Sequence, residues 1–196
     1  ERRFSLQAMV AAYQALYDVA AKKVVQLATV DVPDVTVGNK GDGDVALGTS
    51  ELPYRQEQSW LGRNQADVYL VSPATGAREK VAERLSESPR LSPDGKYAWW
   101  WDGEARAWMA LDTHTKAVRN LTAAAGVAFH DELDDHPDLP PSYGSAGWTE
   151  ADGAFLAYDA YDIWRLDPSG KTAPRTATEG QGRRDGIRFR YASLEA

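Results

Sequence analysis

The chain has 196 residues and a mass of 21.5 kDa, and its 43% hydrophobic and 26% charged residues are typical of a globular protein rather than a disordered one. Its net charge of -7 disfavours nucleic-acid binding, and the absence of cysteine excludes disulfides, thiolate zinc sites and a cysteine nucleophile. No apolar run approaches the ~20 residues that cross a bilayer, and we do not expect Glu1-Arg2-Arg3-Phe4 to begin a signal peptide, because no long apolar segment follows it.

One unit recurs along the chain: a short apolar-alternating strand, a Gly/Lys-type turn and a second strand. Its copies are ALYDVAAKKVVQL (15–27), DVYLVSPATGAREKV (67–81), AWMALDTHTKAVRNL (107–121) and DIWRLDPSGKTAPRT (162–176). Equivalent positions in successive copies are 54, 40 and 55 residues apart. The middle spacing matches a four-stranded propeller blade of roughly 40–45 residues, and the other two require insertions.

A hairpin precedes each of the later copies. These hairpins are VTVGNKGDGDVALG (35–48), LSPDGKYAWWWD (91–102) and WTEADGAFLAYD (148–159). In the second, Pro93 presets φ and Gly95 is free to adopt positive φ, while the third repeats the turn with Asp152-Gly153. The N-terminal segment SLQAMVAAYQALYDVAAKK alone could form an amphipathic helix. Its end matches the other hairpins, so we predict strands there.

The repeat predicts an all-β fold, an antiparallel β-propeller segment spanning residues 1–196 as a single partial domain. The expected blades are 4–28 (partial), 34–83, 88–123 and 144–179, followed by 186–194 as the first strand of a further or closing blade. Such a segment looks like part of a longer polypeptide. Its open edges leave three alternatives: closure into a four-blade ring, a homo-oligomer formed through those edges, or an open arc that needs its missing neighbours.

Two insertions interrupt the blades, at 51–64 and at 127–143. Because strands alternate in direction within a blade, both insertions are expected on the same face of the propeller, where binding loops usually gather. The residues of this expected binding face are Tyr54, Arg55, Trp60, Tyr143, Arg183 and Arg184.

The second insertion contains the densest set of oxygen and imidazole ligands in the chain. The candidate metal ligands are His130, Asp131, Asp134, Asp135, His136 and Asp138. The spacing is not that of an EF-hand, and a solvated or arginine-paired acidic loop is the favoured interpretation, with Arg183 and Arg184 as partners. We therefore expect no metal and no cofactor.

Six tryptophans, Trp99, Trp100, Trp101, Trp108, Trp148 and Trp164, offer stacking platforms for sugars or peptides, or a core. We favour the core, because propeller strands lie between neighbouring blades and bury both faces.

Nothing in the chain forms a nucleophile elbow. The nearest match to G-x-S-x-G is Tyr143-Gly144-Ser145-Ala146-Gly147, where a tyrosine replaces the first glycine and the following residues resemble a strand. The chain alone is therefore not expected to be an enzyme.

Seven segments in order carry a family resemblance: PYRQEQSW (53–60), DVYLVSPATGAREKV, SPRLSPDGKYAWWWDG (88–103), RNLT (119–122), HDELDDHPDLPPSYGSAGWTEADG (130–153), YDIWRLDPSG (161–170) and GRRDGIRFR (182–190). Together they resemble the propeller of prolyl oligopeptidase-family serine peptidases, especially bacterial members similar to dipeptidyl peptidase IV. The resemblance implies an α/β-hydrolase domain with a Ser, Asp, His triad elsewhere on a longer protein. The paired-glutamate motif of dipeptidyl peptidases is absent from this sequence.

Two functions follow as hypotheses. The first is a non-catalytic propeller region that gates or positions peptide substrate for the hydrolase domain of the same polypeptide, with export to the periplasm or medium as in bacterial relatives. The second is a free-standing interaction module that binds peptide or glycan through loops 51–64 and 127–143.

Overall fold

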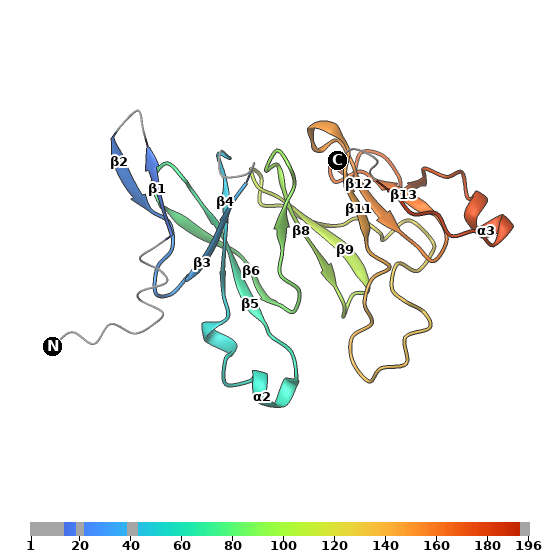
Figure 1. Ribbon diagram of the computed structural model, residues 1–196, viewed down its shortest axis with the longest axis horizontal. Helices are drawn as coiled ribbons and strands as arrows, with labels where there is room; N and C mark the ends of the chain where they lie inside the picture. The colour runs from blue at the N-terminus through green and yellow to red at the C-terminus, as the bar shows by residue number, and fades with distance from the viewer. Residues whose placement is uncertain (1–13, 19–21, 39–42, 193–196) are drawn as a thin grey trace. The chain divides into compact units, whose positions relative to one another are not determined.

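The computed structural model describes residues 14–18, 22–38 and 43–192. The chain divides into two compact units (Figure 1). The N-terminal unit runs up to Ala98 and includes Thr113–Lys116, and the C-terminal unit comprises Trp99–Asp112 and the chain from Ala117 onward.

The described strands form one hairpin and three four-stranded antiparallel sheets. The hairpin pairs β1 (Ala15–Asp18) with β2 (Lys23–Gln26). The first sheet contains β3 (Asp34–Val37), β4 (Ala46–Ser50), β5 (Ala66–Val71) and β6 (Arg78–Leu85). The second contains β7 (Arg90–Leu91), β8 (Tyr97–Asp102), β9 (Ala107–Asp112) and β10 (Val118–Asn120). The third contains β11 (Ser145–Trp148), β12 (Phe155–Tyr158), β13 (Ile163–Leu166) and β14 (Arg175–Thr176).

Within each four-stranded sheet, strands adjacent in sequence are adjacent in space. A four-stranded antiparallel meander is the blade of a β-propeller, and three of them follow one another in chain order. The chain is thus an all-β segment of propeller blades, as the sequence predicted. The described helices are short: η2 (Leu52–Tyr54), α2 (Gln58–Leu61), η3 (Glu150–Asp152) and α3 (Gln181–Asp185). None of them is long and apolar enough to span a membrane.

Turn chemistry explains two of the hairpins. Gly95 has φ of +74° and donates its N–H to the Ser92 carbonyl at 2.9 Å, while Ser92 Oγ accepts the N–H of Tyr97 at 2.9 Å. In the β11–β12 turn the left-handed residues are Ala151 and Asp152, with φ of +56° and +53°, rather than the glycine that follows them. Ala151 and Asp152 have side chains that disfavour this conformation, whereas Gly95 in the first turn adopts it without strain.

The core of the C-terminal unit is aromatic. Trp108 is buried, with its ring centroid 5.5 Å from that of Trp99, 5.4 Å from Trp101 and 5.1 Å from Phe155. Every residue from Ala98 to Trp101 on β8 is buried, so the strand shows no alternation of exposure. The prediction that the tryptophans belong to the core is confirmed for Trp99, Trp100, Trp101, Trp108 and Trp164; Trp148 is half-buried, with its ring 5.3 Å from that of Phe155.

The ends of the described chain differ from expectation in one respect. The hairpin β1–β2 occupies part of the predicted partial blade at 4–28, and its predicted earlier strand, from Leu6, lies outside the described residues. The strand predicted at 186–194 is wrong for residues 186–192, which form none. There the N–H of Phe189 donates to the Tyr161 carbonyl and that of Tyr191 to the Tyr158 hydroxyl, so these donors bond to a loop and a side chain instead of a strand ladder.

Candidate binding loops

The first insertion joins β4 to β5 and contains η2 and α2. Tyr54, at the end of η2, is buried, and its hydroxyl donates a hydrogen bond to Asp67 Oδ1 on β5. The other oxygen of this buried carboxylate lies 2.8 Å from Lys80 Nζ on β6. A side chain predicted for the binding face therefore anchors the loop to the sheet instead, which corrects the expectation for Tyr54.

A second contact set holds the same loop from the end of β6. Arg84 has a left-handed backbone, with φ of +57°, and its Nη2 donates to both carboxylate oxygens of Glu57 at 2.8 Å. Its Nη1 donates to Gln65 Oε1 at 3.1 Å, and its guanidinium carbon lies 4.7 Å from the centre of the Tyr54 ring. The arginine thus connects both ends of the insertion to the edge strand of the blade.

The electrostatics of the anchor follow from its burial. Burial and the hydrogen bond to the Asp67 carboxylate raise the pKa of Tyr54 to about 12. Burial alone would raise the pKa of Asp67, but hydrogen bonds from Lys80 and Tyr54 outweigh it and hold that pKa below its usual value. Bonding to Asp67 raises the pKa of Lys80. Near neutral pH, Tyr54 is therefore a neutral donor to a charged carboxylate.

The tip of this insertion carries an exposed aromatic side chain. Trp60, on α2, is 70% exposed, and its neighbour Leu61 is also exposed. The helix ends at Gly62, whose left-handed φ of +69° lets its N–H bond to the Gln58 carbonyl at 3.1 Å. Arg55 is exposed on the same loop. Of the predicted residues here, Trp60 and Arg55 remain accessible for binding.

The second insertion, between β10 and β11, is held by contacts within the loop and by a hydrogen bond from β8. His130 and Ser142 form an isolated antiparallel bridge, and Trp101 Nε1 donates to the Pro140 carbonyl at 3.1 Å. Tyr143 is half-buried, and its hydroxyl oxygen accepts the Glu132 N–H at 3.1 Å. This tyrosine, predicted as a binding residue, closes the base of the loop.

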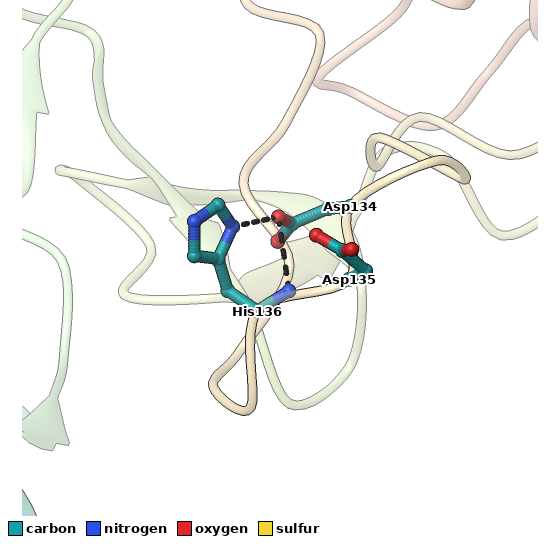
Figure 2. A group of neighbouring side chains, drawn as sticks. All are labelled: Asp134, Asp135 and His136. Atoms are coloured by element: carbon teal, nitrogen blue, oxygen red, sulfur yellow. Dashed lines mark hydrogen bonds and ion pairs between the residues drawn. The ribbon is translucent and has the colours of Figure 1, made fainter.

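Three of the predicted metal ligands gather at the loop tip (Figure 2). Ligand atoms of Asp134, Asp135 and His136 lie within 4.8 Å of one another, and His136 Nδ1 is 2.5 Å from Asp134 Oδ1. This contact lowers the pKa of Asp134 and raises that of His136. The cluster is therefore an aspartate–histidine pair beside a second carboxylate.

The other predicted ligands do not join this cluster. Asp131 Oδ1 accepts the N–H of Leu133 at 3.0 Å, and Asp138 Oδ1 accepts the N–H of Leu139 at 2.7 Å. His130 takes part in the bridge at the base of the loop. The carboxylates of Asp131 and Asp138 stabilise local turns, which is the common role of aspartate in loops.

The arginines expected to pair with the acidic loop contact other groups. Arg183 Nη2 lies 2.9 Å from Asp159 Oδ2, and Arg184 Nη1 donates to the Glu179 carbonyl at 2.7 Å. The bond to Asp159 raises the pKa of Arg183. Among the described residues no ion pair joins either arginine to 130–138, because the buried carboxylate of Asp159 binds Arg183, although the charge of Glu132 in the acidic loop also raises the pKa of Arg183.

Two buried aspartates that were not identified from the sequence, Asp159 and Asp162, accept hydrogen bonds from backbone N–H groups near the C-terminal end of the described chain. Asp159 Oδ1 accepts the N–H groups of Tyr161 at 2.7 Å and Asp162 at 2.5 Å. Asp162 in turn accepts the N–H groups of Gly182 at 2.8 Å and Arg183 at 3.1 Å. The repeated Tyr-Asp pair in YDAYD was the available sequence signal.

No family model matches the chain, and no curated protein matches it in sequence. Solved structures similar to it include TolB from Acinetobacter baumannii, with 17% identity over 83% of this chain and 36% of that one, and a TM-score of 0.43. Another is the β-propeller domain of the Trilobed protease from Pyrococcus furiosus, with 14% identity over 68% of this chain and 40% of that one, and a TM-score of 0.37. The chain spans less than half the length of either structure, and similarity at this level assigns no function.

Proposed function

We propose that the chain is the non-catalytic propeller region of a prolyl oligopeptidase-type serine peptidase. Its blades would gate or position peptide substrate for an α/β-hydrolase domain on the same longer polypeptide. The observation that carries the proposal is the order of the resembling segments along three successive blades: 88–103 spans β7 and β8, and 161–170 spans β13 and the turn after it.

The position of Ser145 supports a propeller region that is not itself catalytic. Ser145, the centre of the nearest match to a nucleophile elbow, is the first residue of β11 and pairs with Ala157 of β12. A nucleophile elbow needs a sharp turn from a strand into a helix, whereas this serine enters a strand. A peptidase nucleophile would therefore belong to another part of the longer polypeptide.

Fluorophosphonate labelling tests the proposal. The intact gene product should react at a serine outside residues 1–196 and hydrolyse chromogenic prolyl or alanyl peptides. The isolated chain should do neither, and Ser145→Ala should change nothing in either sample. Labelling mapped by mass spectrometry to Ser145, or an intact product that is neither labelled nor active, would contradict the proposal.

A second function, a peptide- or glycan-binding module, is favoured by one observation. Trp60 is 70% exposed on a loop that the contacts of Tyr54 and Arg84 fix to the blade. Exposed aromatic side chains on rigid supports are typical binding hot spots, because they contribute contact area at little cost in conformational entropy.

If the isolated chain binds on arrays of short peptides or glycans, Trp60→Ala should weaken binding at least tenfold. Val118→Ala is the control, because Val118 is 47% exposed on β10 and lies outside both insertions. Affinities measured by titration calorimetry should remain within about twofold for this control if Trp60 forms the binding site. Equal losses for both variants, or none for Trp60→Ala, would remove the support for this second function.

A further inference from the structure

A pocket in the C-terminal unit lies between β10 and the turn that joins β13 to β14. Its volume is about 330 Å³, and its apolar lining includes Leu121, Ala173 and Pro174. Two cationic side chains, Arg119 of β10 and Lys171 of the turn, also line it, and both residues are exposed. The pocket therefore has the size of a small-ligand site, and its cations can be reached from solvent.

The repeat along the chain shows what is unusual about these two cations. The spacings of 40 and 55 residues between successive copies place Arg119 at the position of Glu79, and Lys171 at that of Lys116. In the N-terminal unit these positions form an ion pair, with Lys116 Nζ 3.5 Å from Glu79 Oε2. In the C-terminal unit an arginine replaces the glutamate. Neither Arg119 nor Lys171 forms an ion pair with any of the residues that the structure describes.

The guanidinium group of Arg119 lies against a glycine of the turn. A Cβ added at Gly170 would clash with Arg119 Nη1 and would lie 2.8 Å from its Nε. Gly170 has φ of +71°, and its N–H donates to the Asp167 carbonyl at 3.1 Å. The missing side chain at Gly170 therefore leaves the space that the guanidinium occupies.

The carboxylate among the lining residues, that of Asp167, is used by its own turn. Its Oδ1 accepts the N–H and the hydroxyl of Ser169 at 2.8 and 2.6 Å, and its Oδ2 accepts the N–H and the hydroxyl of Thr172, both at 2.9 Å. Burial alone would raise the pKa of Asp167, but these hydrogen bonds outweigh it and lower the pKa to about 2. Two cations and one anion leave the lining with one excess positive charge.

We propose that this pocket binds a small oxyanion, a carboxylate or a phosphate, between Arg119 and Lys171. The anion would supply the negative charge that Glu79 supplies to Lys116 in the N-terminal unit. A planar guanidinium can donate to two oxygens of either group at once, and the lysine adds a point charge. The apolar part of the lining fits a ligand with a small aliphatic body. The inference is independent of the peptidase assignment, because these residues lie outside both insertions.

NMR titration of the 196-residue chain tests the site with two anions and a neutral analogue. N-acetyl-alanine carries a carboxylate, inorganic phosphate is the second anion, and N-acetyl-alaninamide has no charge. Binding should shift the amide signals of Gly170, Lys171 and Thr172 and the Nε–H signal of Arg119, and should saturate with a Kd of about 10 mM or lower for at least one anion. The anion with the lower Kd identifies the oxyanion that the site prefers. The neutral analogue should shift none of these signals.

Charge variants distinguish a site from general attraction to a basic surface. Arg119→Gln should raise the Kd about tenfold or more, and Lys171→Gln about threefold. Arg188→Gln is the control, because it removes an exposed arginine that does not line the pocket, and it should leave the Kd within about twofold. The proposal fails if Arg188→Gln weakens binding as much as Arg119→Gln does, or if neither anion saturates the shifts below about 100 mM.

Two glycine variants test the position of Arg119 without a change of charge. Gly170→Ala displaces the guanidinium and should raise the Kd about fivefold or more. Gly95→Ala is the matched control, because Gly95 has φ of +74° and a Cβ there would meet no atom within 4 Å. Both changes strain a left-handed residue and should lower Tm by similar amounts, but Gly95→Ala should leave the Kd unchanged. Equal Kd values for the two variants would overturn the proposed role of Arg119.

Discussion

Asp159→Ala is expected to lower the free energy of unfolding by about 3 kcal/mol. The side chain is completely buried and accepts the N–H groups of Tyr161 and Asp162 besides its ion pair with Arg183. Each buried donor left without an acceptor costs about 1–3 kcal/mol. Loss of the pair itself adds less, because the Arg183 side chain is 47% exposed and can turn to solvent.

Urea unfolding followed by tryptophan emission measures this loss. Asp159→Asn keeps one acceptor oxygen and should retain part of the stability, while Arg183→Ala should cost only about 1 kcal/mol. Asp185→Ala, at an exposed position of α3, should change stability by less than about 0.5 kcal/mol. A loss below about 1 kcal/mol for Asp159→Ala would show that the two N–H groups find water or another acceptor.

Features set by local chemistry were predictable from the sequence. The Ser-Pro-Asp-Gly turn requires positive φ at one position, and Gly95 adopts it. Runs of aromatic residues on a central strand predicted burial on both faces, and Ala98–Trp101 is buried throughout. In both cases the residues involved lie within a few positions of one another, so the pattern and its cause are contained in one segment.

Features that depend on distant partners were not predictable in the same way. Residues 187–191 alternate like a strand, but a strand needs a neighbour to pair with. The N–H groups of Phe189 and Tyr191 bond instead to the Tyr161 carbonyl and the Tyr158 hydroxyl. Tyr54 lies in a loop without periodicity, so nothing in the sequence near it indicates that its hydroxyl reaches Asp67. In the sequence, Arg183 could pair with the acidic loop 130–138 or with Asp159. Only the fold shows that Asp159 is buried and forms the ion pair.

Asp67→Ala is expected to lower the free energy of unfolding by about 2–3 kcal/mol at pH 7 and to loosen the 51–64 insertion. The change leaves the buried Tyr54 hydroxyl without its acceptor, at a cost of about 1–3 kcal/mol. Lys80 contributes little, because its side chain is 41% exposed and keeps its contact with Glu83 at 3.0 Å.

The stability difference between wild type and Asp67→Ala should depend on pH in one direction. The pKa of Asp67 is lower in the folded chain than its unfolded value of about 3.9, so the folded state favours the ionised form. This stabilisation is fully present above about pH 4 and is lost as the pH falls through the folded-state pKa. The difference should therefore be constant from about pH 5 to 8 and shrink below about pH 4.

Limited trypsin digestion and urea titration together test the anchor. In Asp67→Ala, cleavage after Arg55 and Arg63 should accelerate at least tenfold under conditions where the fold remains intact, because the loop loses its attachment at Tyr54. Glu83→Ala is the control: its carboxylate is exposed and contacts Lys80, but not the loop. If the loop in Asp67→Ala stays as resistant to trypsin as in this control, the contacts of Arg84 with Glu57 and Gln65 hold the insertion without the buried carboxylate.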